Sequence, residues 1–246
     1  MRTEERVPAP ATSARTLAEE VGVVLALSLV GSAVYAVIDL FEAPVAGVYT
    51  FSFPQVNLAR QLAGAILDLA PVWLVLHLVR RSGEGAQAIG LGRGRRGRDF
   101  VRGLALFAVT GLAGLGVYLV SVELGVNRFV VPVPPLGHWW TIPVLLLGSV
   151  QAALLEEVVA VGYLVTRLRQ LRWTGSAAVG ASALLRGAYH LYQGWGAFAG
   201  NLALGLLFGA VFLRTRRAWP LVVAHFLLDV AAGVGFILFR DRLPGF

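Results

Sequence analysis

The amino-acid sequence predicts an all-α protein, a polytopic bundle of about seven (seven to eight) transmembrane helices. Hydrophobic residues make up 57% of its 246 positions and charged residues only 14%, whereas a soluble domain has about 45–50% and about 25%. A membrane-spanning helix needs roughly 20 mostly apolar residues, and the chain offers a series of such runs. They cover 19–39, 60–79, 101–124, 141–166, 174–192, 198–213 and 218–239.

The first three runs form the amino-terminal part of the predicted bundle. Val21–Ile38 is longer than the roughly 7 to 15 residues of a signal-peptide core, so we interpret it as an uncleaved anchor. The second run contains Asp68 near Pro71, and this carboxylate either caps a kink at the proline or pairs with Arg186 of a later run. The stretch 40–58 leaves an eighth helix or a re-entrant segment open, because irregular backbone is tolerated at membrane depth when protein surrounds it.

The distribution of arginine predicts the topology. Arginine supplies all 21 basic residues, and most of them lie in alternate links between the runs. The positive-inside rule then places the tail 1–18 in the cytoplasm and the carboxyl terminus outside. The formal charge of +7 is thus explained without nucleic-acid binding. We expect the Gly- and Arg-rich link 80–102 to be mobile and to attract anionic lipid headgroups.

The composition also bears on chemistry and location. The chain has no cysteine, which excludes disulfides, thiolate metal sites and a cysteine nucleophile. Lysine is absent as well, as is typical of a high-GC bacterial genome. The expected location is therefore the bacterial cytoplasmic membrane.

The last four runs contain polar residues that are costly in lipid. Three of these runs carry six such residues, namely Glu156, Glu157, Arg186, His190, His225 and Asp229. The last four of these form two pairs spaced four apart, so each pair shares one helix face. Inserting the four charged residues, Glu156, Glu157, Arg186 and Asp229, would cost on the order of 10–14 kcal/mol if all were ionised, unpaired and at the centre of the bilayer. We therefore expect the six to face one another or a hydrated cavity, where they could support general acid–base chemistry, although single polar residues also serve as interhelical contacts.

These residues resemble the motifs of a known family, the CAAX prenyl proteases and bacteriocin-processing enzymes (CPBP, or Abi-domain, intramembrane endopeptidases). The family has two adjacent glutamates with an arginine four residues after the second, then Phe-x-x-x-His, then His-x-x-x-Asn/Asp. Here Glu156-Glu157 matches the first motif, Arg186-Gly-Ala-Tyr-His190 part of the second, and His225-Phe-Leu-Leu-Asp229 the third. The apolar runs predict a single membrane domain, 19–240. The resemblance covers about 141–240 and implies a catalytic core there, whereas the preceding helices, 19–124, resemble no known family.

The resemblance also implies roles for the site residues. Glu156, beside Glu157, would activate a water molecule as general base with help from His190. His225 and Asp229 would stabilise the oxyanion, and we favour an orienting role for Asp229, because an ionised carboxylate only accepts hydrogen bonds.

Two positions depart from the family pattern: Val161 replaces the arginine and Arg186 replaces the phenylalanine. We hypothesise that Arg186 reaches the glutamate pair from its new position and neutralises it. His190 lies about 17 residues from the arginine-rich start of its run, which would place it deeper in the membrane than Glu156 or His225. A helix that begins only at Ser176 would narrow that gap.

The sequence predicts an intramembrane endopeptidase acting on a peptide or protein substrate in or at the lipid bilayer. The alternatives are a non-catalytic membrane adaptor or immunity-type relative that binds peptides, and, less favoured, a proton-coupled transporter. Two histidines and a glutamate would also suit zinc. The direct glutamate–histidine mechanism needs no metal, so no cofactor is expected.

Overall fold

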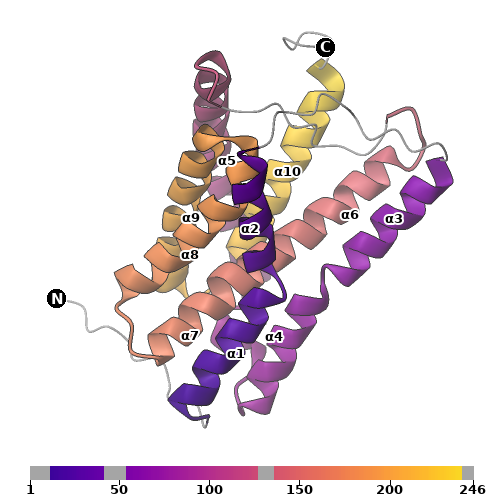
Figure 1. The fold of residues 1–246 in the computed structure, drawn as a ribbon. Helices are drawn as coiled ribbons and strands as arrows, with labels where there is room; N and C mark the ends of the chain where they lie inside the picture. Colours follow the sequence, from indigo (N-terminus) through magenta and orange to yellow (C-terminus); the bar gives the residue numbers. More distant parts are fainter. Residues whose placement is uncertain (1–11, 42–53, 127–135, 240–246) are drawn as a thin grey trace.

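The computed structural model describes residues 12–41, 54–126 and 136–239, and within these ranges all the regular structure is helical. The helices lie side by side in a bundle (Figure 1). Their bounds are α1 Ala14–Ala26, α2 Leu29–Asp39, α3 Pro54–Leu67, α4 Ala70–Arg81, α5 Arg96–Glu123, α6 Thr141–Leu154, α7 Leu164–Gln170, α8 Gly175–Tyr189, α9 Trp195–Thr215 and α10 Trp219–Phe239. The prediction of an all-α membrane bundle is confirmed.

The number of candidate spans in the described ranges is roughly compatible with the predicted seven. In the described ranges, five helices are long and apolar enough to cross a membrane, and the bent pair α1–α2 makes up to six. The fifth predicted run, 174–192, corresponds to α8, which has only 15 residues, or about 22 Å at 1.5 Å per residue. The proposed eighth helix at 40–58 falls mostly on 42–53, outside the described residues.

Two spans are interrupted, each at a recognisable local signal. The axis bends by 47° between α1 and α2, where the Ser28 hydroxyl donates to Val24 O at 2.6 Å. The break between α3 and α4 falls at Asp68, just before Pro71, which lacks the N–H that a continuous helix requires. Asp68 lies in this break, but among the described residues no side chain caps the start of α4, and Arg186 makes its contacts elsewhere, so neither predicted role of Asp68 is observed.

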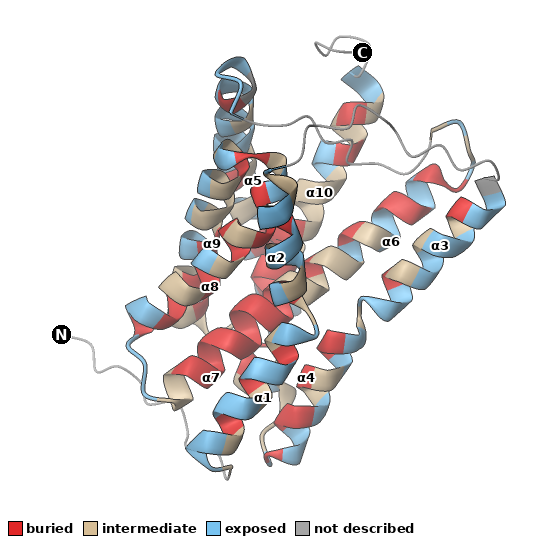
Figure 2. Ribbon diagram, in the orientation of Figure 1, coloured by how far each residue is buried: buried red, intermediate tan, exposed pale blue. Residues whose placement is uncertain are grey.

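The helix that carries the two glutamates is the centre of the bundle. Half of the apolar membrane-crossing segment within Thr141–Gln170 is buried inside the bundle, whereas only 11% of the corresponding segment of α5 is buried. Every residue from 157 to 168 is buried, and this stretch forms the largest buried area in Figure 2. By contrast, α5 exposes many large apolar side chains to the lipid side.

The link 80–102, which the sequence predicts to be mobile, packs onto the bundle at 86–90, whereas 93–98 is exposed. A short 3-10 helix, η1 (Ala86–Ile89), inserts Ile89 with no exposed surface. The link also makes hydrogen bonds to two helices: Thr166 Oγ1 donates to Ala88 O at 3.3 Å, and the Ala218 N–H donates to Gly90 O at 3.0 Å. It therefore ties α7 to the start of α10.

The arginine-bearing links lie together at one end of the bundle. Arg81 pairs with Glu20 of α1 at 3.0 Å, and Arg217, just before α10, pairs with Asp99 near the start of α5. We call this the arginine end and expect it to face the cytoplasm.

Candidate active site

The glutamates lie on a stretch of widened helix that the sequence analysis did not anticipate. Leu155–Tyr163 forms a π-helix, η2, between α6 and α7, and the Leu164 N–H donates five residues back to Val159 O. Since a wider turn contains more residues, adjacent side chains diverge less in direction. Glu156 and Glu157 can therefore reach a common partner. Short π-turns within α-helices occur frequently at functional sites.

Neighbouring segments support the π-helix from two sides. The Ser182 hydroxyl of α8 donates to Ala160 O at 2.6 Å, so a carbonyl of the widened turn has a partner outside its own helix. On another side, a Cβ added at Gly162 would lie only 2.6 Å from Ile89 O of the arginine-end link. Glycine is thus what allows the link to approach η2 so closely.

Helix α8 brings Arg186 and His190 to the glutamates. It begins at Gly175 after Thr174, whose hydroxyl accepts from the Ala177 N–H at 3.2 Å, one residue earlier than the sequence suggested. Its small residues pack tightly on α9, where a Cβ at Gly205 would lie 2.8 Å from the Ala183 Cα. His190 directly follows Tyr189, the last residue of α8, so the end of this helix positions the His190 side chain in the bundle.

Arg186 joins the two glutamates. Its Nη1 lies 2.6 Å from Glu157 Oε1 and its Nη2 lies 3.4 Å from Glu156 Oε2. The Arg186 side chain is 2% exposed, Glu157 is fully buried and Glu156 is 14% exposed. One guanidinium therefore compensates two carboxylates in a dry interior, and Glu156 is the one that keeps contact with the surroundings.

His225 of α10 completes the buried group, and its contacts decide which ring nitrogen is free. Its Nδ1 lies 2.8 Å from Glu157 Oε1 and 3.3 Å from Arg186 Nη2. A carboxylate accepts and a guanidinium only donates, so the shorter contact requires the proton on Nδ1, which donates to Glu157. The other nitrogen, Nε2, is then available for chemistry.

Asp229 and His190 lie at the margin of this group. The nearer Asp229 oxygen is 3.6 Å from His225 Nε2 and the side chain is 36% exposed, so Glu157 makes the tighter contact with the ring. His190 Nδ1 lies 3.0 Å from Arg186 O, which fixes its proton on Nδ1 and leaves Nε2 free.

Tyr189 belongs to the same group and was missed in the sequence analysis. Its hydroxyl donates to Glu156 Oε2 at 2.7 Å, and the residue is only 6% exposed. The available signal was its position three residues after Arg186, since residues three apart lie on one side of a helix.

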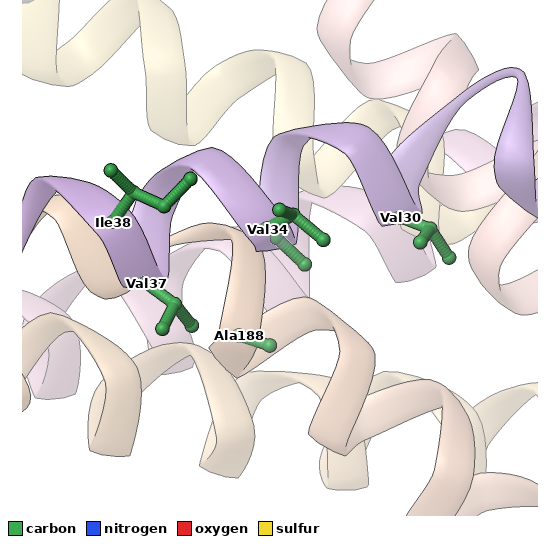
Figure 3. A pocket seen from close by; sticks show the side chains of 6 residues that line it. Val30, Val34, Val37, Ile38 and Ala188 are labelled. Atoms are coloured by element: carbon green, nitrogen blue, oxygen red, sulfur yellow. The ribbon is translucent and has the colours of Figure 1, made fainter.

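An apolar surface groove is separate from this group. It has a volume of about 330 Å³ and lies between α2 and α8, lined by Val30, Ala33, Val34, Val37, Ile38 and Ala188. In Figure 3 the valines of α2 lie beside Ala188. The lining is entirely apolar, as expected of a lipid-facing surface, and none of the six predicted site residues contributes to it.

Comparison with known families identifies one matching family model. Residues 138–231 match the family model described as type II CAAX prenyl endopeptidase Rce1-like. This segment contains all six predicted site residues. The resemblance to the CPBP family is confirmed. No curated protein and no solved structure matches the chain. Together, the match and the membrane-spanning helices describe a multi-pass membrane protein with a CAAX-protease-like segment.

Within the matched segment, the structure also locates the two departures from the family motifs. Val161 is 1% exposed and lies on η2 one turn beyond Glu157. Arg186 approaches the glutamate pair from α8, and its guanidinium also lies 5.6 Å from the centre of the Phe208 ring, within range of a cation–π interaction. A positive charge is thus supplied to the pair from a different helix.

The same residues offer a donor set for a metal ion. Glu156, Glu157 and His225 each present a ligand atom, and these atoms lie within 4.8 Å of one another. Oxygen and imidazole ligands suit zinc. However, the Arg186 guanidinium already lies against both carboxylates, in the position where a cation would compensate them. The residues therefore fit a metal in ligand type but not in charge.

Proposed function

We propose that this protein is an intramembrane endopeptidase in which Glu156 activates the attacking water. The observation that carries the proposal is the convergence of Glu156, Glu157, Arg186 and His225 from three helices, with Glu156 the exposed member of the carboxylate pair. Buried charges of this kind are costly, and inside a membrane they commonly mark functional sites.

The contacts support different roles for Glu156 and Glu157. Arg186 and His225 hold Glu157, so it organises the group, whereas Glu156 is open to a water molecule. In the proposed reaction, Glu156 takes a proton from the water, which attacks the peptide carbonyl, and then passes the proton to the leaving amine. The free Nε2 of His190 accepts a hydrogen bond from the same water and orients it.

His225 would stabilise the oxyanion through Nε2. Because Nδ1 donates to Glu157, Nε2 is a donor when the ring carries both protons, and Glu157 and Asp229 would balance the resulting charge. An ionic donor aimed at a developing oxyanion is worth about 3–4 kcal/mol in a preorganised site. Asp229 then supports the charge of His225, and Glu157 orients its ring.

The substrate class proposed is a peptide or protein segment in or at the membrane. We also propose that catalysis needs no metal, because Arg186 supplies the compensating charge. A chelator should then leave cleavage unchanged, whereas loss of activity on chelation and its return with zinc would contradict this part of the proposal.

The test is cleavage of a peptide library by the purified full chain in lipid nanodiscs. Glu156→Gln should lower the rate about 10²- to 10⁴-fold, the range expected for a general base. The matched control is Glu19→Gln, because the Glu19 side chain is 61% exposed at the bundle surface. Equal cleavage by the wild type and Glu156→Gln would overturn the mechanism. Peptide binding without cleavage by the wild type would favour a non-catalytic relative.

A further inference from the structure

The Glu156 carboxylate is held on one side only. Its Oε2 accepts from the Tyr189 hydroxyl at 2.7 Å and lies 3.4 Å from Arg186 Nη2. Among the described residues, no hydrogen-bond donor contacts its Oε1, and this oxygen is not among the buried unpaired atoms. The two oxygens are therefore unequal, one fixed by α8 and the other open.

The last turn of α8 is suited to fixing that oxygen. Arg186 and Tyr189 are three residues apart and contact the same oxygen, and the backbone carbonyl of Arg186 also orients His190. The rings of Tyr189 and His190 lie 4.8 Å apart with a 41° tilt. One short stretch of chain thus positions both the glutamate and its histidine neighbour.

A phenol has properties that a second cation would lack. It is a neutral donor, so it directs the carboxylate without cancelling its negative charge, and its rigid ring has few rotatable bonds. The distance of 2.7 Å is typical of a short O–H···O⁻ hydrogen bond. Because Tyr189 is buried beside η2, the hydroxyl has little freedom to turn elsewhere.

We infer that Tyr189 is a positioning residue that holds Oε2 of Glu156 and so presents Oε1 to the attacking water. The catalytic part of this inference rests on the proposed function. The structural part, that Tyr189 holds Glu156, stands on the contacts alone. A hydroxyl that only fills a packing site would make no difference to turnover by folded protein, and this separates the two possibilities.

The first measurement is steady-state kinetics of Tyr189→Phe per folded molecule. We expect kcat to fall about tenfold or more, the effect of losing a hydrogen bond to a charged group, with KM little changed. The control is Tyr35→Phe, because Tyr35 is 69% exposed on α2; its kcat should match the wild type. An unchanged kcat in Tyr189→Phe would overturn the inference while the peptidase proposal stands.

The second measurement does not depend on activity. A double-mutant cycle combines Tyr189→Phe with Glu156→Ala and follows unfolding in mixed micelles. We expect the two changes to be coupled, with a non-additive effect of at least threefold on the unfolding equilibrium. If the wild type cleaves nothing but coupling is found, the peptidase proposal fails and Tyr189 still holds Glu156. Additive effects would overturn the inference whatever the activity.

Discussion

Two clusters of buried charged residues in this molecule contain similar residue types but differ in their hydrogen bonding. The site cluster consists of Glu156, Glu157, Arg186 and His225. The arginine-end cluster consists of Arg167, Glu84, Gln170 and Ser82, and joins α7 to the link after α4. Each contains an arginine almost without exposed surface, and each joins segments far apart in the chain.

The two clusters differ in which atoms remain free. In the arginine-end cluster both oxygens of Glu84 are bonded: Oε1 accepts from Gln170 Nε2 at 2.6 Å, and Oε2 accepts from Arg167 and from the Ser82 hydroxyl. In the site cluster, one oxygen of Glu156 and one nitrogen of His225 remain open. The arginine-end cluster also contains no imidazole.

This difference shows that a buried ion pair alone does not indicate chemistry. Arg167 was interpreted from the sequence as a topology residue in a polar link, yet it is fully buried and paired with Glu84. Both oxygens of its partner Glu84 are bonded, which fits a structural role. A candidate site requires, in addition, open acceptors and donors that face the same point.

The largest expected effect is that of removing the charge from the site cluster. Arg186→Ala leaves two carboxylates without their guanidinium and should destabilise the protein by about 3–5 kcal/mol, as when one partner of a buried pair is lost. Adding Val161→Arg should restore part of that loss, because the arginine would then extend from η2 beside Glu157. Unfolding by denaturant in mixed micelles measures both variants. Strictly additive effects would mean that the two positions do not exchange roles.

A smaller effect is expected from the arginine-end cluster, and it should affect stability only. Arg167→Met keeps the volume of the side chain but leaves Glu84 unpaired, at a cost of about 2–3 kcal/mol, because Glu84 can still reach water at this end. Cleavage per folded molecule should stay at the wild-type level. If the rate fell as far as in Glu156→Gln, the distinction between a structural and a chemical cluster would be wrong.

The smallest effect concerns the contact between the arginine-end link and η2. Gly162→Ala places a methyl group against Ile89 O and should cost about 1–2 kcal/mol, as overpacking does. Gly180→Ala is the matched control, because a Cβ there meets nothing within 4 Å, so it should be neutral or stabilising by up to about 1 kcal/mol. Thermal unfolding compares the pair. Equal melting temperatures would show that the link yields without strain.

Much of the architecture follows from the sequence because membrane helices are specified by local composition. Long apolar runs and alternating arginine links predicted the all-α bundle, and spacings of four predicted which polar residues share a helix face. Of the six predicted site residues, Glu156, Glu157, Arg186 and His225 meet directly, with Asp229 and His190 beside them. Such periodicities depend on helix geometry alone.

Only the tertiary structure could decide the features that depend on partners distant in the chain. Ser182 donates to Ala160 O at the π-helix, and Arg167 pairs with a glutamate 83 residues away. The Gly-rich link packs on the bundle because Ile89 is buried there. Sequence spacing describes one helix at a time, whereas packing brings together side chains from several. The helices and the polar residues that they carry could therefore be predicted from the sequence. The packing of those helices decides which oxygen of Glu156 is held and which is open.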